Sequence, residues 1–107
     1  MNIIINNNKI ELINGNNFYN RLIGLMFKKY IKKGLYLPNC NSIHTFFMKE
    51  NIDLIMLDKN NIVIDYKIDF CKNKIYYKKE VQHIIELPKN TISNINIGDK
   101  INIEYPK

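Results

Sequence analysis

The sequence predicts a mainly β protein of a single domain, an all-β sandwich or barrel with an N-terminal hairpin and one short helix. Short apolar and β-branched runs recur along the chain, and clusters of Asn, Gly, Pro and Asp separate them. One stretch has the spacing of an amphipathic helix. With 107 residues the chain has the length of one domain, residues 1–107, and can bury a core without disulfides or metals.

The first part of the chain predicts the hairpin and then the helix. Two apolar runs, 3–5 and 10–13, lie on either side of Asn6–Asn8, and asparagine tolerates the left-handed backbone of tight turns. Residues 18–27 then place apolar side chains at the i, i+4, i+7 and i+8 positions of a helix, after an asparagine that can cap it.

The rest of the chain predicts seven further strands. Their ranges are 35–37, 42–48, 52–57, 62–70, 75–77, 81–87 and 101–105. Residues 52–57 are apolar on both faces except at Asp53, which is typical of a strand buried on both sides. Residues 62–70 alternate, so we expect the even-numbered side chains to form the dry face and the odd-numbered ones the wet face. Asp58 and Asp99 are expected turn formers.

The stretch from Cys40 to Val63 is the densest apolar run, and it contains an unusual strand face. In a strand at 42–48, one face would hold Cys40, Ser42, His44, Phe46 and Met48, and the other Asn41, Ile43, Thr45 and Phe47. A core-facing strand does not need Cys, Ser and His on a single face. The mixture predicts the wall of a pocket.

The net charge of +6 raises the question of nucleic-acid binding. The chain has 21 Ile, 18 Asn and 15 Lys but no Ala, which indicates a genome of skewed base composition. The lysines are scattered and no aromatic stripe accompanies them, so we expect a solvated surface and no nucleic-acid partner. Because nearly all other basic residues are lysines, the single arginine, Arg21, indicates a need for its planar guanidinium group. It would either form a structural salt bridge or bind an anion.

The cellular setting predicted from the sequence is cytoplasmic. Met1–Asn6 lacks the features of a signal peptide, and no run of about 18 apolar residues could span a membrane. Two cysteines are too few for a disulfide framework, so we expect Cys40 and Cys71 to be free thiols.

Three motifs resemble the family called domain of unknown function 192. They are R-L-I-G-L-M-F at 21–27, S-I-H-T-F-F-M-K-E-N-I-D-L-I-M-L-D at 42–58, and I-I-E-L-P-K-N-T-I at 84–92 followed by I-G-D-K-I at 97–101. The resemblance implies a small β-rich fold of two packed sheets similar to a jelly roll, and no established reaction. The chain departs from the family at Phe70–Asn73, where many members have a proline-containing loop.

A salt bridge of Arg21 is the leading interpretation of the buried carboxylates. Asp53 lies inside a strand expected to be buried, so its charge must be paired, hydrogen-bonded or protonated. Arg21 is the obvious partner, and a bond to Asp53 or to Glu86 would clamp the helix onto the sheet.

Two functions remain open from the sequence. The first is a non-enzymatic module, a monomer or weak dimer without a cofactor, that binds a small polar or anionic molecule or a protein partner. Its cavity would lie between the Arg21 helix and the central strands, with Arg21, His44, Met48, Asp53 and Glu86 as binding residues. The second is a small hydrolase or thiol enzyme that uses Cys40, His44 and Asp53. Four strand residues span about 13 Å, too far for a Cys40–His44 hydrogen bond or a shared metal in one straight strand.

Overall fold

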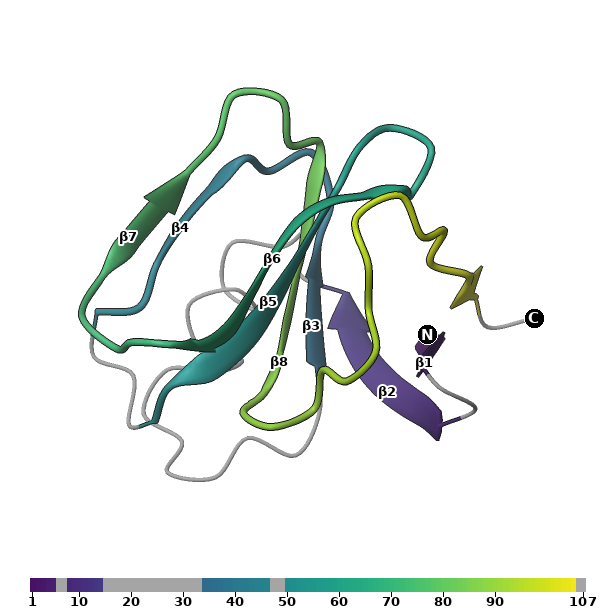
Figure 1. Ribbon diagram of the computed structural model, residues 1–107, viewed down its shortest axis with the longest axis horizontal. Coiled ribbons are helices and arrows are strands. Elements are labelled where there is room, and N and C mark those ends of the chain that lie inside the picture. Colours follow the sequence, from purple (N-terminus) through teal and green to yellow (C-terminus); the bar gives the residue numbers. More distant parts are fainter. Residues whose placement is uncertain (6–7, 15–33, 47–49, 106–107) are drawn as a thin grey trace.

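Nine β-strands in two sheets form the computed structural model, which describes residues 1–5, 8–14, 34–46 and 50–105 (Figure 1). The strands are β1 (Asn2–Ile5), β2 (Asn8–Asn14), β3 (Gly34–Leu37), β4 (Ser42–His44), β5 (Ile52–Leu57), β6 (Val63–Phe70), β7 (Ile75–Tyr77), β8 (His83–Pro88) and β9 (Ile103–Glu104). The prediction of a mainly β protein is confirmed. The helix expected at 18–27 lies outside the described residues.

The large sheet has the strand order β6-β5-β8-β3-β2-β1-β9, and β4 and β7 form a small sheet. In Figure 1 the small sheet lies on one side of the molecule, and both termini lie on the opposite side. The large sheet is open and does not close into a barrel, and the jelly-roll arrangement stays a prediction. No helix that is long and apolar enough to cross a membrane occurs in the described ranges.

The N-terminal hairpin is confirmed, because β1 and β2 pair antiparallel with Asn2 opposite Glu11 and Ile5 opposite Asn8. β2 continues the sheet through a parallel pairing with β3, and the remaining neighbours of the large sheet are antiparallel. Asparagine supplies most of the positive-φ turn positions, since its side chain tolerates the left-handed backbone. These residues are Asn39, Asn61, Asn73, Asn90 and Asn94.

β5 separates two hydrophobic cores, and all six of its residues are buried. Ile55 and Leu57 pack into core A, which we define as the cluster with β1 and the connection between β8 and β9. Leu54 and Met56 pack into core B, which lies under the small sheet and includes Ile43 and Tyr76. The prediction that 52–57 is buried on both faces is therefore confirmed. Each fully buried aliphatic side chain contributes roughly 1.5–3 kcal/mol.

The alternation expected for residues 62–70 is wrong. Val63, assigned to the wet face, is fully buried, whereas Ile68, assigned to the dry face, is 55% exposed. The register against β5 shifts twice, between Met56 and Leu57 and between Ile52 and Leu54. At each of these β-bulges β6 has one residue more than β5, and an extra residue reverses which side chains face the core.

The strand expected at 42–48 is shorter than predicted. β4 ends at His44, Thr45 lies outside it, and Phe46 is in a turn. Phe47 and Met48 lie outside the described residues, so the prediction that Met48 shares a strand face with His44 stays untested.

Gly34 lies where β2, β3 and β8 approach closely, and this geometry predicts the effect of a side chain. A Cβ atom added at Gly34 would lie 2.4 Å from Leu12 Cδ2, 2.7 Å from Leu87 Cδ2 and 3.0 Å from the Glu86 carbonyl oxygen. We expect Gly34→Ala to lower the free energy of unfolding by about 1–3 kcal/mol through overpacking, as measured by urea denaturation. Unchanged stability would mean that the Leu12 and Leu87 side chains move aside without cost.

Candidate functional site

The face predicted as a pocket wall is the outer surface of the small sheet. Ser42, His44 and Phe46 are exposed, and Ile43 and Thr45 are buried, so the predicted alternation holds through these residues. The rings of His44 and Phe46 are stacked with their centroids 5.0 Å apart. His44 therefore belongs to an exposed aromatic surface.

The carboxylate of Asp53 is a buried acceptor for three backbone N–H groups. Oδ1 accepts the N–H of Asp69 at 2.9 Å, and Oδ2 accepts those of Thr91 and Ile92, each at 2.9 Å. Asp69 lies in the second bulge of β6, opposite Asp53 itself, and has a φ of 57°. The carboxylate thus fixes the bulge of β6 and the connection after β8 to the beginning of β5.

Asp53 and Glu86 lie on opposite faces of the large sheet. Glu86 is opposite Leu54 in the β5–β8 pairing, and successive strand residues point to opposite faces. Leu54 belongs to core B, so Glu86 faces core B and Asp53 faces core A. Both are buried, but one cavity cannot hold both carboxylates. Arg21 lies outside the described residues, and its salt bridge stays a prediction.

The residues of the enzyme alternative have separate surroundings. The Cys40 thiol donates a hydrogen bond to the Ser42 carbonyl, with a sulfur–oxygen distance of 3.0 Å. His44 stacks on Phe46, and Asp53 binds backbone amides on the other sheet. Cys40 and Cys71 are both free, the first half-buried and the second exposed. Within the described ranges no three His, Cys, Asp or Glu side chains form a group that could hold a metal ion.

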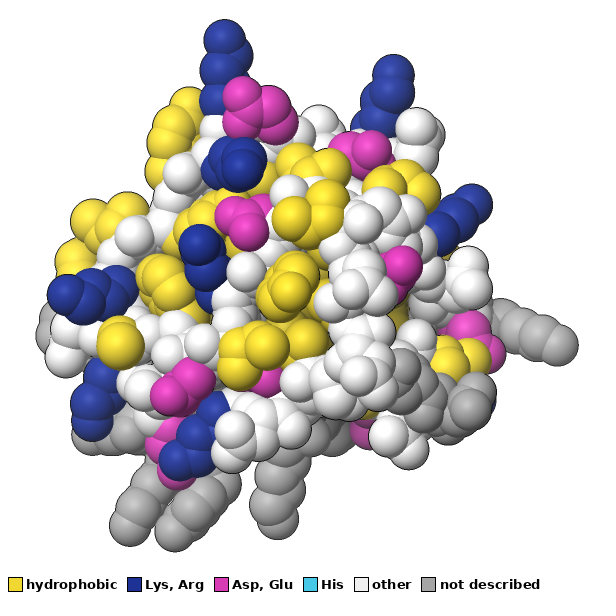
Figure 2. All heavy atoms as spheres, in the orientation of Figure 1, with side chains coloured by type: hydrophobic (Ala, Val, Ile, Leu, Met, Phe, Trp, Pro, Cys, Tyr) yellow, Lys and Arg dark blue, Asp and Glu magenta, His cyan; other side chains and the backbone are white. Residues whose placement is uncertain are grey.

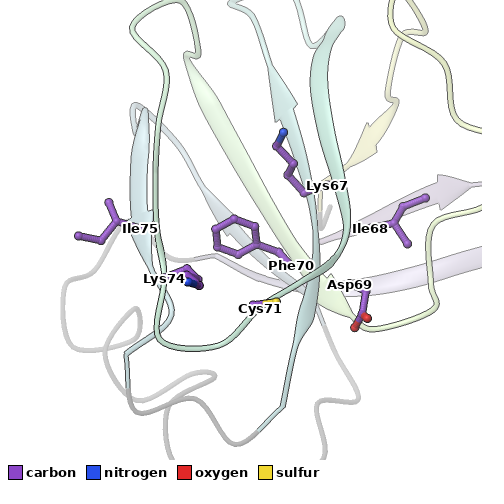
Figure 3. A pocket seen from close by; sticks show the side chains of 7 residues that line it. All are labelled: Lys67, Ile68, Asp69, Phe70, Cys71, Lys74 and Ile75. Carbon is purple, nitrogen blue, oxygen red and sulfur yellow. The ribbon is translucent and has the colours of Figure 1, made fainter.

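An open groove of about 350 Å³ lies between the end of β6 and the start of β7 (Figure 3). It is lined by Lys67, Ile68, Asp69, Phe70, Cys71, Lys74 and Ile75. Figure 3 shows the Phe70 ring in the space between the two strands, with the side chain of Lys74 beside it and that of Lys67 above it. Two lysines and an aromatic ring therefore line the same groove.

The walls of this groove are held by hydrogen bonds from two buried side chains. Thr45 Oγ1 donates to the Cys71 carbonyl at 2.8 Å and accepts the N–H of Lys74 at 2.9 Å, which shapes the turn before β7. The Tyr76 hydroxyl donates to Asp65 Oδ2 at 2.9 Å and so ties β7 to β6. Burial, and then the bond to Asp65, raise the pKa of Tyr76, so that it stays a donor.

Sequence reasoning missed this groove. Its lining residues belong to no motif, apart from the Phe70–Asn73 segment, which departs from the family pattern. The second bulge of β6, which determines where Ile68 and Phe70 point, leaves no mark in the hydrophobic pattern. A signal was available in Thr45, whose hydroxyl organises residues 71–74, but its role depends on a contact 29 residues distant in sequence.

His83 lies half-buried at the start of β8, beside the turn that follows β3. Its Nδ1 accepts the backbone N–H of Asn39 at 3.1 Å, and its ring is 5.6 Å from that of Tyr36. Burial lowers the pKa of His83 below its ordinary value of 6.5, and the carboxylate of Asp58 partly offsets this effect. The neutral imidazole is therefore the form that the fold favours.

The turn-forming aspartates are confirmed. Asp58 Oδ1 accepts the N–H groups of Asn60 and Ile62, and Asp99 Oδ2 accepts the N–H of Asn96. Both carboxylates bind nearby backbone, as short polar side chains do in turns.

Comparison with known proteins agrees with the resemblance noted in the sequence. The model of the family DUF192, described as Uncharacterized ACR, matches residues 2–103. A UPF0127 protein of Pyrococcus furiosus is 30% identical over 102 residues, which cover 87% of this chain and 86% of that protein. A UPF0127 protein of Pyrococcus horikoshii is 39% identical over 93 residues, which cover 78% of this chain and 79% of that protein. Matches to two Thermococcus relatives cover only 62% and 59% of their lengths.

A solved structure supports the fold. A protein of unknown function from Novosphingobium aromaticivorans superposes with a TM-score of 0.72 and covers 95% of this chain and 82% of its own. Its sequence identity is 14%, so the similarity concerns the fold alone.

We expect Asp53→Asn to lower the free energy of unfolding by about 2–4 kcal/mol, because an amide NH2 would replace one acceptor oxygen opposite buried N–H groups. Urea denaturation measures the change. Asp58→Asn is the matched control, since a single oxygen, Oδ1, accepts both of its backbone bonds, and we expect a loss below about 1 kcal/mol. Equal losses in both variants would contradict the role assigned to Asp53.

The lowered pKa of His83 predicts a loss of stability in acid. Below its ordinary pKa of 6.5 the unfolded chain binds the proton more readily than the fold, so the free energy of unfolding falls as the pH drops. Protonation also removes the acceptor for the Asn39 N–H. Urea denaturation between pH 7.5 and 5 should show a shallower decline for His83→Gln than for the wild type. Parallel curves would show that His83 does not contribute.

Proposed function

We propose that this chain, which belongs to the DUF192 family, is a non-enzymatic binding module for a small anionic molecule with an apolar part. The observation that carries the proposal is the groove between β6 and β7, where Lys67 and Lys74 accompany the ring of Phe70. The proposal includes a cytoplasmic location and a monomer or weak dimer that acts without a cofactor.

Charge supports an anionic ligand for this groove. Within the described ranges, no carboxylate forms an ion pair with the Lys67 or Lys74 ammonium group. Asp69 is the acidic residue of the lining, and its Oδ1 accepts a hydrogen bond from Asn51 Nδ2 at 3.1 Å. Ammonium groups act as mobile point charges, which suit a carboxylate, phosphate or sulfonate without demanding one geometry.

The shape of the groove supports a ligand that also has an apolar part. Phe70 packs edge-on against Tyr76, with ring centroids 6.5 Å apart, and this contact helps to fix the position of the Phe70 ring. Thr45 and Tyr76 hold the two walls through partly buried hydrogen bonds. A partly preformed apolar surface with a few placed polar groups is the usual form of a small-molecule site.

The enzyme alternative has less support. Nucleophilic catalysis requires a nucleophile and a base within hydrogen-bond reach of each other. The thiol of Cys40 binds the Ser42 carbonyl, and the oxygens of Asp53 bind backbone amides on another sheet. A cavity that uses Arg21 and Met48 stays a separate prediction.

The fluorescent probe 8-anilinonaphthalene-1-sulfonate tests the proposal, because it combines a sulfonate with aromatic rings. We expect the folded protein to bind it, and the double variant Lys67→Gln, Lys74→Gln to bind about tenfold more weakly through loss of two charges. Fluorescence titration measures both affinities.

A double variant of matched charge, Lys59→Gln with Lys89→Gln, is the control, because both lysines are exposed and neither lines the groove. It should bind the probe like the wild type. Equal weakening in the two double variants would indicate a general charge effect, and unchanged binding in both would place the probe elsewhere. Either result would overturn the assignment of the groove.

A further inference from the structure

The small sheet presents a second surface on its outer face, which adjoins the groove and shares Ile75 with it. Ile75 and Tyr77 of β7 are 67% and 61% exposed, unusually high for large apolar side chains in a strand. Across the sheet Ile75 is opposite His44, and Phe46 follows with 38% exposed. In Figure 2 hydrophobic side chains reach the surface over the region of β7, with lysine side chains beside them. These exposed apolar side chains lie on or beside one face of the small sheet, and such a concentration of exposed apolar groups indicates a site of interaction.

The backbone of β7 has one edge with which no strand of the described residues pairs. The N–H of Thr45 donates to the Lys74 carbonyl at 2.8 Å, and the N–H of Lys78 donates to the Asn41 carbonyl at 3.1 Å. Hydrogen-bonded pairs alternate with non-bonded ones in an antiparallel ladder, so the His44–Ile75 and Ser42–Tyr77 pairs are non-bonded. The N–H and C=O groups of Ile75 and Tyr77 therefore point away from β4. Among the described strands, none pairs with this edge.

The charges around β7 are predominantly positive. Lys72 and Lys74 precede the strand, Lys78 and Lys79 follow it, and all four are exposed. Glu80 is the single acidic residue of the segment 71–80. A partner that lies along β7 would meet two lysines at each end of the strand.

We propose that β7 docks an extended, acidic segment of a partner protein by strand addition. The free N–H and C=O groups would pair with the segment's backbone, Ile75 and Tyr77 would receive its alternate apolar side chains, and the lysines would bind its carboxylates. The unpaired edge favours a peptide over a nucleic acid, since stacking on Tyr77 and Phe46 would leave these backbone groups unused. This inference does not depend on the ligand of the groove.

The test uses a blocked peptide in which Glu and Val alternate, titrated into the isotope-labelled full chain and followed by NMR. We expect the amide signals of Ile75 and Tyr77 to shift and their hydrogen exchange to slow. The same peptide with every second amide N-methylated should bind about tenfold more weakly, because it loses about two backbone hydrogen bonds. A peptide of alternating Lys and Val should not bind.

Charge variants identify the surface. Lys72→Glu with Lys78→Glu should weaken binding of the Glu–Val peptide about tenfold, whereas Lys59→Glu with Lys89→Glu, of equal charge change, should not. All four lysines are exposed, and thermal unfolding checks that each variant is folded. Lys67 and Lys74, which test the proposed function, stay unchanged in these variants. A negative result here therefore contradicts this inference without contradicting the proposed function.

Four results would overturn the proposal. They are no binding of the Glu–Val peptide at millimolar concentration, equal binding of the N-methylated peptide, equal weakening by both pairs of charge variants, and tighter binding of an oligothymidylate than of the peptide. The last result would assign the surface to single-stranded nucleic acid.

Discussion

The rest of the structure depends on the carboxylate of Asp53, a charged group placed within β5, a strand buried on both faces. A charge in such a position is tolerated only when hydrogen bonds replace the water it has lost. Three backbone N–H groups from two other segments do so. The same bonds give the second bulge of β6 and the irregular connection after β8 a fixed place against the sheet. The hydrogen bonds that compensate for the buried carboxylate therefore also hold these two irregular segments in place.

The positions of the strands could be predicted from the sequence, because the turns between them are determined by the residues of the turns themselves. Asp58–Asn61 and Asn90 show this, since their short polar side chains favour turns without reference to the rest of the chain. The bulges of β6 could not be predicted, since they depend on register against β5. The first bulge places Val63 and Tyr66 on the same face, toward core A, although the alternation assigned them to opposite faces. Asp53 was correctly identified as a buried group that needs partners, but its partners among the described residues are backbone amides, which have no signature in a sequence.

In the candidate site, too, local features could be predicted and features that depend on distant contacts could not. The strand face of Ser42, His44 and Phe46 was predicted correctly up to Phe46, yet it faces outward, because Ile43 and Thr45 fill the side toward core B. Which face of a short strand is inside depends on the sheet that it covers. The groove beside Phe70 depends on Thr45 and Tyr76, whose hydrogen-bond partners are distant in sequence. A polar residue at a buried position just after β4 therefore serves to build the turn that lines the groove.

The two bulges of β6 have a further consequence for a chain that contains 21 isoleucines. β6 ends the large sheet, and a long regular strand at that position would be a template for intermolecular pairing and aggregation. Bulges interrupt the regular spacing of its free backbone groups, and Lys67 adds an exposed charge. At the opposite end β9 is only two residues long, which offers little backbone for pairing. The large sheet is thus protected at both ends against growth into fibrils, a safeguard that its isoleucine-rich strands need at high protein concentration.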